Sequence, residues 1–220
     1  MCGRFTQTFD VKKLLDSLGV SVQNPPPLKP SYNIAPAQPV AVFRYDRELK
    51  LELMSWGLVP SWAKDPKAGY GMINARSETL DQRPSFKGLL RNHRCLIPAD
   101  GFYEWKQEGR LKKPYFIRMK SKEPFTFAAL WSHWAGSNGS EILSCAIITG
   151  APNELLKPIH HRMPVILPKE RRAEWLSPDC YDPKYLSTLL EVYPENELEA
   201  YPVSTRVNDP KNDSADCIQP

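Results

Sequence analysis

The second residue of this chain has the most unusual latent chemistry. The sequence begins Met1-Cys2-Gly3-Arg4-Phe5, and a small residue after the initiator Met usually permits removal of that Met. Cys2 would then carry an α-amine of reference pKa about 7.7–8.0 beside a thiol of about 8.5, both partly reactive near neutral pH. Such a 1,2-aminothiol captures an aldehyde: the amine condenses to a Schiff base and the thiol closes a thiazolidine ring. The alternatives are a hydrolase nucleophile or a terminus that frays.

Two further groups could move protons. Glu104 stands among large aromatic residues in a predicted strand, where Glu is uncommon and where apolar surroundings would raise its pKa towards neutrality. An exposed strand carboxylate is the alternative. His160 and His161 are adjacent, and we expect at most one of the two imidazoles to face a given site because neighbouring side chains point in different directions.

Several other polar and aromatic residues suit a polyanionic ligand. Arg4, Arg76 and Arg162 could each hold a phosphate in bidentate geometry. Asn74 shares one side of an extended segment with Arg76, although it could equally cap a turn. Three tryptophans suit either a core or the stacking of bases: Trp56, Trp62 and Trp105.

The composition is that of one globular domain. The chain has 220 residues, of which 41% are hydrophobic and 22 are proline, and this pattern indicates rigid loops around a sizeable core. No apolar run approaches the ~20 residues of a membrane span, and no signal peptide is visible. We therefore expect a cytoplasmic protein. Five scattered cysteines without a C-x-x-C pair predict neither a disulfide framework nor a zinc site.

Charge is unevenly distributed along the chain. The net charge is +4, but residues 191–220 hold seven of the 25 acidic residues and two of the 29 basic ones, which leaves +9 on the rest. A basic body with an acidic C-terminal segment fits a polyanionic partner.

The elements that must position these groups are mainly strands. Asp10, an apolar spacing of i, i+3, i+4, i+7 and Gly19 predict a helix over residues 10–19. Shorter helices are expected at 153–158, 168–176 and 182–190, and a turn at 108–110 should join two strands as a hairpin. The fold predicted is a single α+β domain, with an antiparallel β-rich, barrel-like core and short flanking helices. Strand-like runs cover residues 40–44, 49–56, 94–98, 102–106, 115–120, 125–131 and 143–149.

Seven short motifs together resemble one known family, the SRAP family of SOS-response-associated peptidases, understood as abasic-site processing proteins. The match runs from Cys2 to about Asn212 and implies one SRAP-like domain over residues 1–220, with the acidic segment 191–220 packed on it or trailing from it. The motifs occur in this order: Cys2-Gly3-Arg4-Phe5, Tyr32-Asn33-Ile34-Ala35-Pro36, Trp56-Gly57-Leu58-Val59-Pro60, Ile73-Asn74-Ala75-Arg76-Ser77-Glu78-Thr79, Phe102-Tyr103-Glu104-Trp105, Ile159-His160-His161-Arg162-Met163-Pro164 and Pro202-Val203-Ser204.

The resemblance implies a specific chemistry in the DNA damage and SOS response. The amine and thiol of Cys2 would form a thiazolidine crosslink with the ring-opened aldehyde of an abasic site in single-stranded DNA, which shields the lesion. Glu104 matches the acid–base carboxylate of the family, His160 matches its imidazole, and Asn74 matches the amide that orients the opened sugar.

The resemblance also implies a DNA-binding set and no cofactor. The DNA contacts are assigned to Arg4, Asn33, Trp62, Arg76 and Arg162, of which the arginines would hold backbone phosphates. Neither a metal nor an organic cofactor is implied, and the protein is expected to be monomeric, cytoplasmic and associated with the nucleoid when bound to DNA.

This chain differs from the family in the residue at the position of the apolar wedge. It falls at residues 84–86, where the small Ser85 stands in place of a larger apolar residue. A wedge would open a bent single strand, and so this departure leaves the identity of the wedge residue undetermined.

Two other functions remain open at this level. Cys2 with His160 as base could form a cysteine-type peptidase, acting on the residue before Cys2 or on other peptides. The basic body and the tryptophans could also form a non-covalent module for single-stranded DNA. An abasic-site lyase side reaction is compatible with the first function, because a Schiff base acidifies the adjacent carbon of the sugar.

Overall fold

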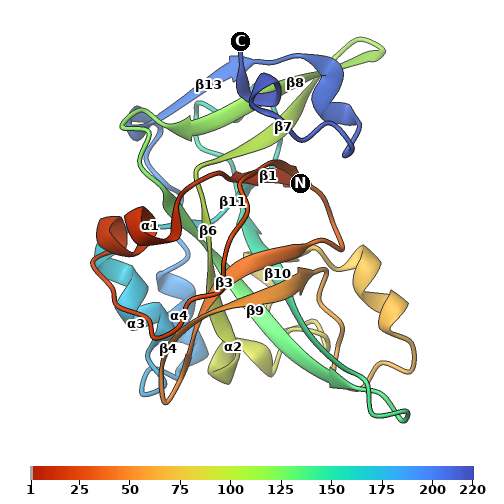
Figure 1. The fold of residues 1–220 in the computed structure, drawn as a ribbon, viewed down its shortest axis with the longest axis vertical. Helices are drawn as coiled ribbons and strands as arrows, with labels where there is room; N and C mark the ends of the chain where they lie inside the picture. Colours follow the sequence, from red (N-terminus) through yellow and green to blue (C-terminus); the bar gives the residue numbers. More distant parts are fainter. Residues whose placement is uncertain (1) are drawn as a thin grey trace.

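A closed ring of five strands forms the centre of the molecule (Figure 1). The computed structural model describes residues 2–220. Within that range, β10 pairs in turn with β4, β3, β6 and β9, and β9 pairs back with β10. Neighbours in the ring are antiparallel except β4 and β10, which are parallel. This arrangement confirms the predicted barrel-like core. Its strands are β3 (Pro39–Asp46), β4 (Glu48–Trp56), β6 (Arg94–Ala99), β9 (Phe125–Ala135) and β10 (Glu141–Gly150).

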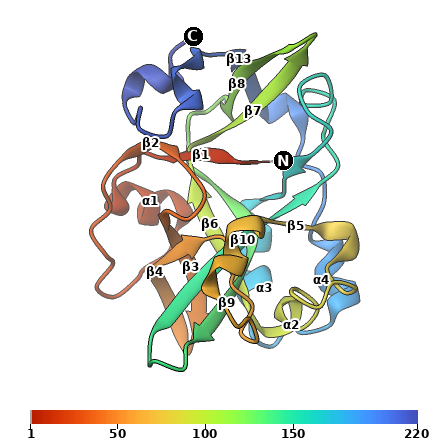
Figure 2. The ribbon, with the colours of Figure 1, turned by 90° about the vertical axis from the view of Figure 1, so that its right-hand side faces the viewer.

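A second sheet lies on one end of this barrel. Its order among the described residues is β13-β8-β7-β1-β2, and both views place β13 and β8 farthest from the barrel (Figures 1 and 2). The β7–β8 hairpin turns at Gly109, whose φ of 60° suits glycine, which confirms the predicted turn. The strands are β1 (Arg4–Gln7), β2 (Ser31–Ile34), β7 (Gly101–Glu108), β8 (Leu111–Met119) and β13 (Leu198–Pro202).

Three short strands extend the barrel beside β10 and β9. β5 (Asn74–Arg76) runs parallel to β10, and β11 (Met163–Pro164) pairs antiparallel with the same strand. β12 (Ile166–Leu167) pairs with β9. Because β5 and β11 share β10, the segments around residues 74 and 162 are brought to one end of the barrel.

The helices are short and surround the ring. The longest, α1 (Val11–Leu18), begins where the Asp10 carboxylate accepts from the Lys13 amide at 3.1 Å and ends at Gly19 with φ 65°, as predicted. The others are α2 (Leu89–Asn92), α3 (Arg172–Leu176), α4 (Pro183–Thr188) and the 3-10 segments η1 (Pro66–Gly71), η2 (Ser77–Thr79), η3 (Lys169–Arg171), η4 (Glu195–Glu197), η5 (Thr205–Asn208) and η6 (Ala215–Ile218).

One predicted helix is wrong. Residues 153–158 form hydrogen-bonded turns, in which the Asn153 side-chain oxygen accepts from the Leu156 amide at 3.0 Å. Pro158 has no amide hydrogen and disfavours helical backbone at the preceding residue, so the turns do not propagate. The helices expected at 168–176 and 182–190 are present as η3 with α3 and as α4.

The strands of the barrel have two apolar faces. Val40 and Val42 face the interior with Phe5, while the alternate residues Ala41 and Phe43 pack under the helices. The interior contains aromatic contacts such as Phe5 against Trp56, with centroids 4.9 Å apart at 74°. No helix within residues 2–220 is long and apolar enough to cross a membrane.

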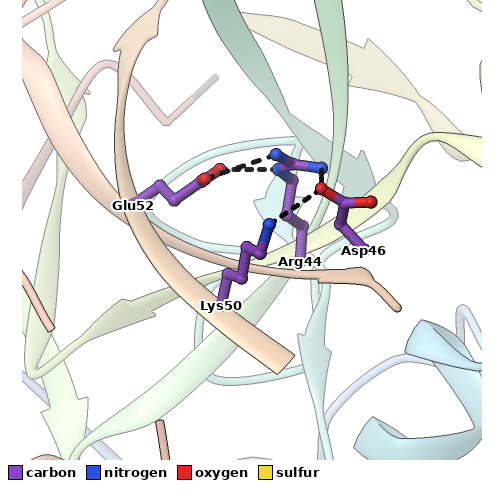
Figure 3. Close-up of polar contacts among 4 residues, drawn as sticks. All are labelled: Arg44, Asp46, Lys50 and Glu52. Atoms are coloured by element: carbon purple, nitrogen blue, oxygen red, sulfur yellow. Dashed lines mark hydrogen bonds and ion pairs between the residues drawn. The ribbon is translucent and has the colours of Figure 1, made fainter. Parts of the chain in front are cut away.

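A charged cluster closes the far end of the β3–β4 hairpin (Figure 3). Arg44 lies between the carboxylates of Glu52 (Nε–Oε2 2.6 Å) and Asp46 (Nη1–Oδ2 3.4 Å), and Lys50 pairs with Asp46 at 3.0 Å. The Arg44 guanidinium also lies over the Trp131 ring, 4.7 Å from its centroid. Because its partners all lie on barrel strands, this arginine stabilises the hairpin.

Candidate functional site

Cys2 is buried at the junction of the barrel and the second sheet. β1 pairs with β7 in the register Arg4–Tyr103, which brings the start of the chain beside the strand that carries Glu104. Cys2 has no exposed surface, and its carbonyl accepts a hydrogen bond from Asn74 Nδ2 at 2.9 Å. The side-chain sulfur donates to the Arg4 carbonyl at 3.7 Å. The N-terminal Cys2 segment is therefore fixed by the fold, which contradicts the alternative of a frayed terminus.

The burial of Cys2 corrects one expectation about its thiol. From the reference value alone, the thiol would be partly ionised near neutral pH. Burial, reinforced by the nearby charge of Glu104, raises the pKa of the Cys2 thiol far above its usual range. The thiol is therefore protonated at neutral pH. In this form it is a weak nucleophile, so it would need a strongly electrophilic partner or a base that takes its proton.

Glu104 is buried beside Cys2 on β7. Only 2% of it is exposed, so the alternative of an exposed strand carboxylate is wrong. Burial raises the pKa of Glu104 to about 7. At neutral pH both protonation states are then populated, which is the condition for efficient general acid and general base catalysis.

His160 faces Glu104 from the loop before β11. Its Nδ1 lies 3.9 Å from Glu104 Oε2 and accepts from the Arg162 amide at 3.1 Å. The loop is anchored by Asn153, whose side-chain Nδ2 donates to the Tyr193 carbonyl at 2.9 Å. Burial lowers the pKa of His160, so the imidazole is neutral at pH 7 and could pass protons to and from a substrate.

The prediction that the two adjacent histidines point in different directions is wrong. The rings of His160 and His161 lie 4.3 Å apart at 31°, and both line the same cleft. The loop is not an extended strand, so the alternation that would point the two side chains apart does not apply. The cleft has a volume of about 640 Å³ and opens from Glu104 and His160 towards the surface. Its other lining residues are Trp105, Gln107, Lys112, Lys157, Pro158, Ile159 and Asn208.

Asn74 is positioned by the β5 strand and by a close glycine contact. The Trp56 indole donates to the Ile73 carbonyl at 2.9 Å, immediately before Asn74. Gly57 has φ 138°, and a Cβ there would lie 2.7 Å from the Gly69 carbonyl oxygen, so only glycine fits. Among the described residues, the buried Asn74 Oδ1 has no hydrogen-bond partner. This oxygen is available to accept from a ligand.

Arg4 and Asn33 are engaged with the C-terminal segment 207–212. Arg4 Nη1 donates to Asn33 Oδ1 at 2.8 Å and to the Val207 carbonyl at 2.7 Å. The Asn33 amide donates to the carbonyls of Val207, Asp209 and Asn212 at 2.8–3.1 Å. Both residues thus hold this segment against β1 and β2, and a phosphate would have to exchange these contacts.

The remaining residues of the predicted DNA-binding set differ in exposure. Arg162 forms a bidentate ion pair with Glu78, at 2.6 and 2.9 Å, and is largely buried. Arg76 on β5 is exposed, and Trp62 is 64% exposed. Arg76 and Trp62 are therefore directly accessible to a ligand, whereas Arg162 already has an internal partner.

Two parts of the site had no clear signal in the sequence. Asn153 anchors the His160 loop, and the turn that its side chain forms with Leu156 has the same residue pattern as the start of a helix. Asn208 lines the cleft and accepts from the Trp105 indole at 2.8 Å, across a separation of 103 residues. At the predicted wedge position, Phe86 is only 9% exposed and packs in the core, which leaves the exposed Pro84 and the half-buried Ser85.

The donor groups of the described residues form no metal site. No group of three or more His, Cys, Asp or Glu side chains within residues 2–220 is placed to hold a metal ion. The cysteines in that range are all free thiols.

Comparisons with known proteins agree with the motifs. The family model of the SOS response associated peptidase (SRAP) matches residues 1–210. The chain is 46% identical to the abasic site processing protein YoqW of Bacillus subtilis, over 100% of this chain and 99% of that protein. It is 33% identical to the abasic site processing protein YedK of Escherichia coli over 100% of both chains. A crystal structure of a Bacteroides thetaiotaomicron protein superposes with TM-score 0.89 at 25% identity and covers 99% of each chain. This chain therefore belongs to the SRAP family.

Proposed function

We propose that this protein processes abasic sites in DNA, and that it does so by a covalent crosslink between Cys2 and the lesion in single-stranded DNA. The observation that supports this most strongly is the surroundings of Cys2. Asn74 holds its carbonyl at 2.9 Å, and Glu104, with a pKa of about 7, lies beside it within 3.9 Å of His160. Relatives named abasic site processing proteins support the substrate class.

The chemistry begins at the α-amine of Cys2 once Met1 has been removed. Met1 lies outside the described residues, so its removal stays a prediction. The amine nitrogen adds to the aldehyde carbon of the opened sugar, and the resulting carbinolamine loses water to give a Schiff base. The sulfur then adds to the same carbon, and the thiol proton moves to the nitrogen. The net change is one water released and one thiazolidine ring formed.

The burial of the thiol sets the order of these steps. A protonated thiol is a poor nucleophile towards the aldehyde itself. The iminium carbon is more electrophilic, and a general base is needed to take the thiol proton at that stage. Glu104 is a buried acid–base group that lies close enough for its charge to act on the thiol. Protonated Glu104 would help water to leave, and its carboxylate would then accept the thiol proton.

His160 and Asn74 would act on the opened sugar. The neutral imidazole of His160, at the wall of the cleft, is placed to exchange protons with the sugar hydroxyls during ring opening and during reversal of the crosslink. The unpartnered Asn74 Oδ1 would accept from a sugar hydroxyl, while its Nδ2 holds Cys2. The strand itself would contact the exposed Arg76 and Trp62 and, after exchange of partners, Arg4, Asn33 and Arg162.

A denaturing gel tests the proposal. Wild-type protein is mixed with labelled single-stranded DNA that carries one abasic site, and a species that survives denaturation is expected. Intact DNA and the Cys2→Ala variant should give none. With borohydride, Cys2→Ala should be trapped as a reduced Schiff base, because it keeps the α-amine. A stable crosslink in Cys2→Ala without borohydride would refute the role of the thiol.

Two accompanying activities follow from the same groups. We assign the peptidase activity in the family's description to removal of Met1 alone. The Cys2 sulfur donates to a backbone carbonyl and its thiol has a raised pKa, whereas the nucleophile of a general peptidase is activated. An abasic-site lyase reaction would follow if a base removes the acidified proton before the thiol adds. Steady hydrolysis of an unrelated peptide that is lost in both Cys2→Ala and His160→Ala would favour the general peptidase instead.

A further inference from the structure

The carboxylate of Glu78 has no part in the chemistry proposed for Cys2, yet it is bound to the loop that carries His160. Glu78 lies on η2, directly after β5, and its two oxygens accept from Nη1 and Nη2 of Arg162 at 2.6 and 2.9 Å. Hydrogen bonding to Arg162 lowers the pKa of Glu78, so the carboxylate is ionised at neutral pH. The pair is therefore a charge-assisted, bidentate contact between η2 and the segment before β11.

The guanidinium of Arg162 is enclosed on another side by the end of β10. Its Nη2 also donates to the Thr149 carbonyl and lies 3.3 Å from Thr149 Oγ1. The side chain of Arg162 is 11% exposed, whereas that of Glu78 is 51% exposed. Removal of the Glu78 charge would leave a largely buried guanidinium without this counter-ion. We therefore expect the Arg162 side chain to move towards solvent in that case and to displace its own backbone.

The backbone of Arg162 holds the imidazole of His160. The amide nitrogen and the carbonyl oxygen of Arg162 each lie 3.1 Å from His160 Nδ1. The amide can donate when Nδ1 is bare, and the carbonyl can accept when Nδ1 is protonated. The ring therefore keeps its orientation beside Glu104 while it gains or loses a proton. A group that fixes the Arg162 backbone thus fixes an acid–base residue in both of its protonation states.

We propose that Glu78 is a positioning residue for His160 and acts on it through Arg162. The inference rests on the function proposed above, because it requires His160 to exchange protons with the opened sugar. It also requires that Glu78 stays paired in the DNA complex, so that a phosphate meets the second hydrogen of Arg162 Nη1 rather than replacing Glu78. The competing role for Glu78 is to mask Arg162 from phosphates. Loss of a mask would tighten DNA binding, whereas loss of a positioning residue slows the reaction.

Crosslinking kinetics in a double-mutant cycle test this proposal. Initial rates are measured for the wild type, Glu78→Gln, His160→Ala and the double variant over a range of concentrations of single-stranded abasic DNA. Glu78→Gln should lower the rate at saturating DNA about tenfold and leave the half-saturating concentration within about twofold. In the His160→Ala background it should lower the saturating rate by less than about twofold, because its effect passes through the imidazole. Glu154→Gln is the matched control: it removes an exposed ion pair with Lys157 in the same loop and should change nothing.

The ring signals of protein labelled with 15N-histidine give a second readout, which needs no DNA. In Glu78→Gln the signals of His160 should shift, whereas those of His93 after α2 and His133 on β9 should keep their wild-type positions. The midpoint of thermal unfolding should stay within about 4 °C of the wild type, because Glu78 is half exposed. That midpoint shows that the variant is folded.

Several results would overturn the positioning role of Glu78. Tighter DNA binding with an unchanged saturating rate would indicate a mask on Arg162 instead. Equal effects of Glu78→Gln in both backgrounds, or unshifted His160 signals, would show that Glu78 does not act through the imidazole. A His160→Ala protein that crosslinks as fast as the wild type would leave Glu78 no role to support. A wild type that forms no crosslink would refute the function of Cys2, and the histidine spectra would still show whether Glu78 holds the His160 ring.

Discussion

Replacement of Glu104 by glutamine should stabilise the folded protein while it removes the proposed acid–base group. In the folded protein burial raises the pKa of Glu104 from 4.5 to about 7. The unfolded chain loses this proton near pH 4.5, whereas the folded protein keeps it to about pH 7. Between these values the folded state binds more protons than the unfolded state, so the contribution of Glu104 to stability falls as pH rises.

The size of this effect follows from the two pKa values. One pKa unit corresponds to about 1.36 kcal/mol, so an ionised Glu104 costs about 3 kcal/mol of unfolding free energy above pH 7. Exposure of 2% means that solvent screens little of this cost. Glutamine has nearly the same shape and no charge, and so Glu104→Gln should be more stable than the wild type by up to about 3 kcal/mol at pH 8.

Urea unfolding at several pH values would measure this difference. At pH 8 the variant should unfold at a higher urea midpoint than the wild type, and at pH 4 the two midpoints should converge. The m-values should be equal, which would show that the unfolded states are comparable. The matched control is Glu108→Gln at the exposed end of the same strand, for which no such pH-dependent gap is expected. A Glu104→Gln variant that is equally or less stable at pH 8 would refute the argument that burial dominates the energetics of this carboxyl.

Three further substitutions test how the site is supported. Arg94 is 5% exposed and donates to five backbone carbonyls from α2, α3 and the loop after α3, so Arg94→Met should lower the unfolding free energy by about 3–5 kcal/mol, measured by urea unfolding. Asn33→Ala removes three hydrogen bonds to segment 207–212 and should cost about 2–3 kcal/mol while it increases amide hydrogen exchange in that segment; unchanged exchange would contradict the role of Asn33 as its anchor. Gly57→Ala should lower the unfolding free energy by at least about 2 kcal/mol, because it adds a Cβ 2.7 Å from the Gly69 carbonyl oxygen at a φ of 138°. It should also slow crosslinking, because Gly57 supports the segment that positions Asn74; crosslinking at the wild-type rate would count against this support.

Local sequence signals predicted the elements, because each of those signals acts over a few residues. The cap at Asp10 and the stop at Gly19 gave α1 its bounds, and the Gly109 turn placed the β7–β8 hairpin. The closure of the ring had no such signal. β4 and β10 are parallel neighbours from distant parts of the chain, and their pairing depends on the packing of the whole barrel rather than on either segment. The helix predicted at residues 153–158 does not form, because the Asn153 side chain accepts from the Leu156 amide and stabilises a turn instead.

The candidate site shows the same division between residue type and residue partner. Glu104 and Asn74 stand out in the sequence by their types and motifs, yet the contact of Asn74 with Cys2 spans 72 residues and depends on β5 lying beside β10. The guanidinium of Arg4 suits a phosphate, but its hydrogen bonds to the Val207 and Asn208 carbonyls cross more than 200 residues. A polar side chain does not specify its own partner, so the sequence could indicate which groups are present without indicating which are already satisfied.

The stability cost of Glu104 also bears on the dense packing of the second sheet beside Cys2. A buried carboxyl with a raised pKa destabilises the fold at the pH where its proposed acid–base function would be useful. Its strand β7 is held on one side by β1 and on the other by β8, and Phe102 and Tyr103 beside it are fully buried. The free energy gained by burying these aromatic rings offsets the cost of the carboxyl and fixes the strand that carries it.

Loss of aromatic packing at Phe102 should therefore loosen Glu104, let water reach it and return its pKa towards 4.5. A Phe102→Leu variant should then show a pH optimum for crosslinking shifted to lower pH, measured from initial rates between pH 5 and pH 9. An unshifted optimum in a folded Phe102→Leu protein would contradict the claim that this packing sets the protonation of Glu104.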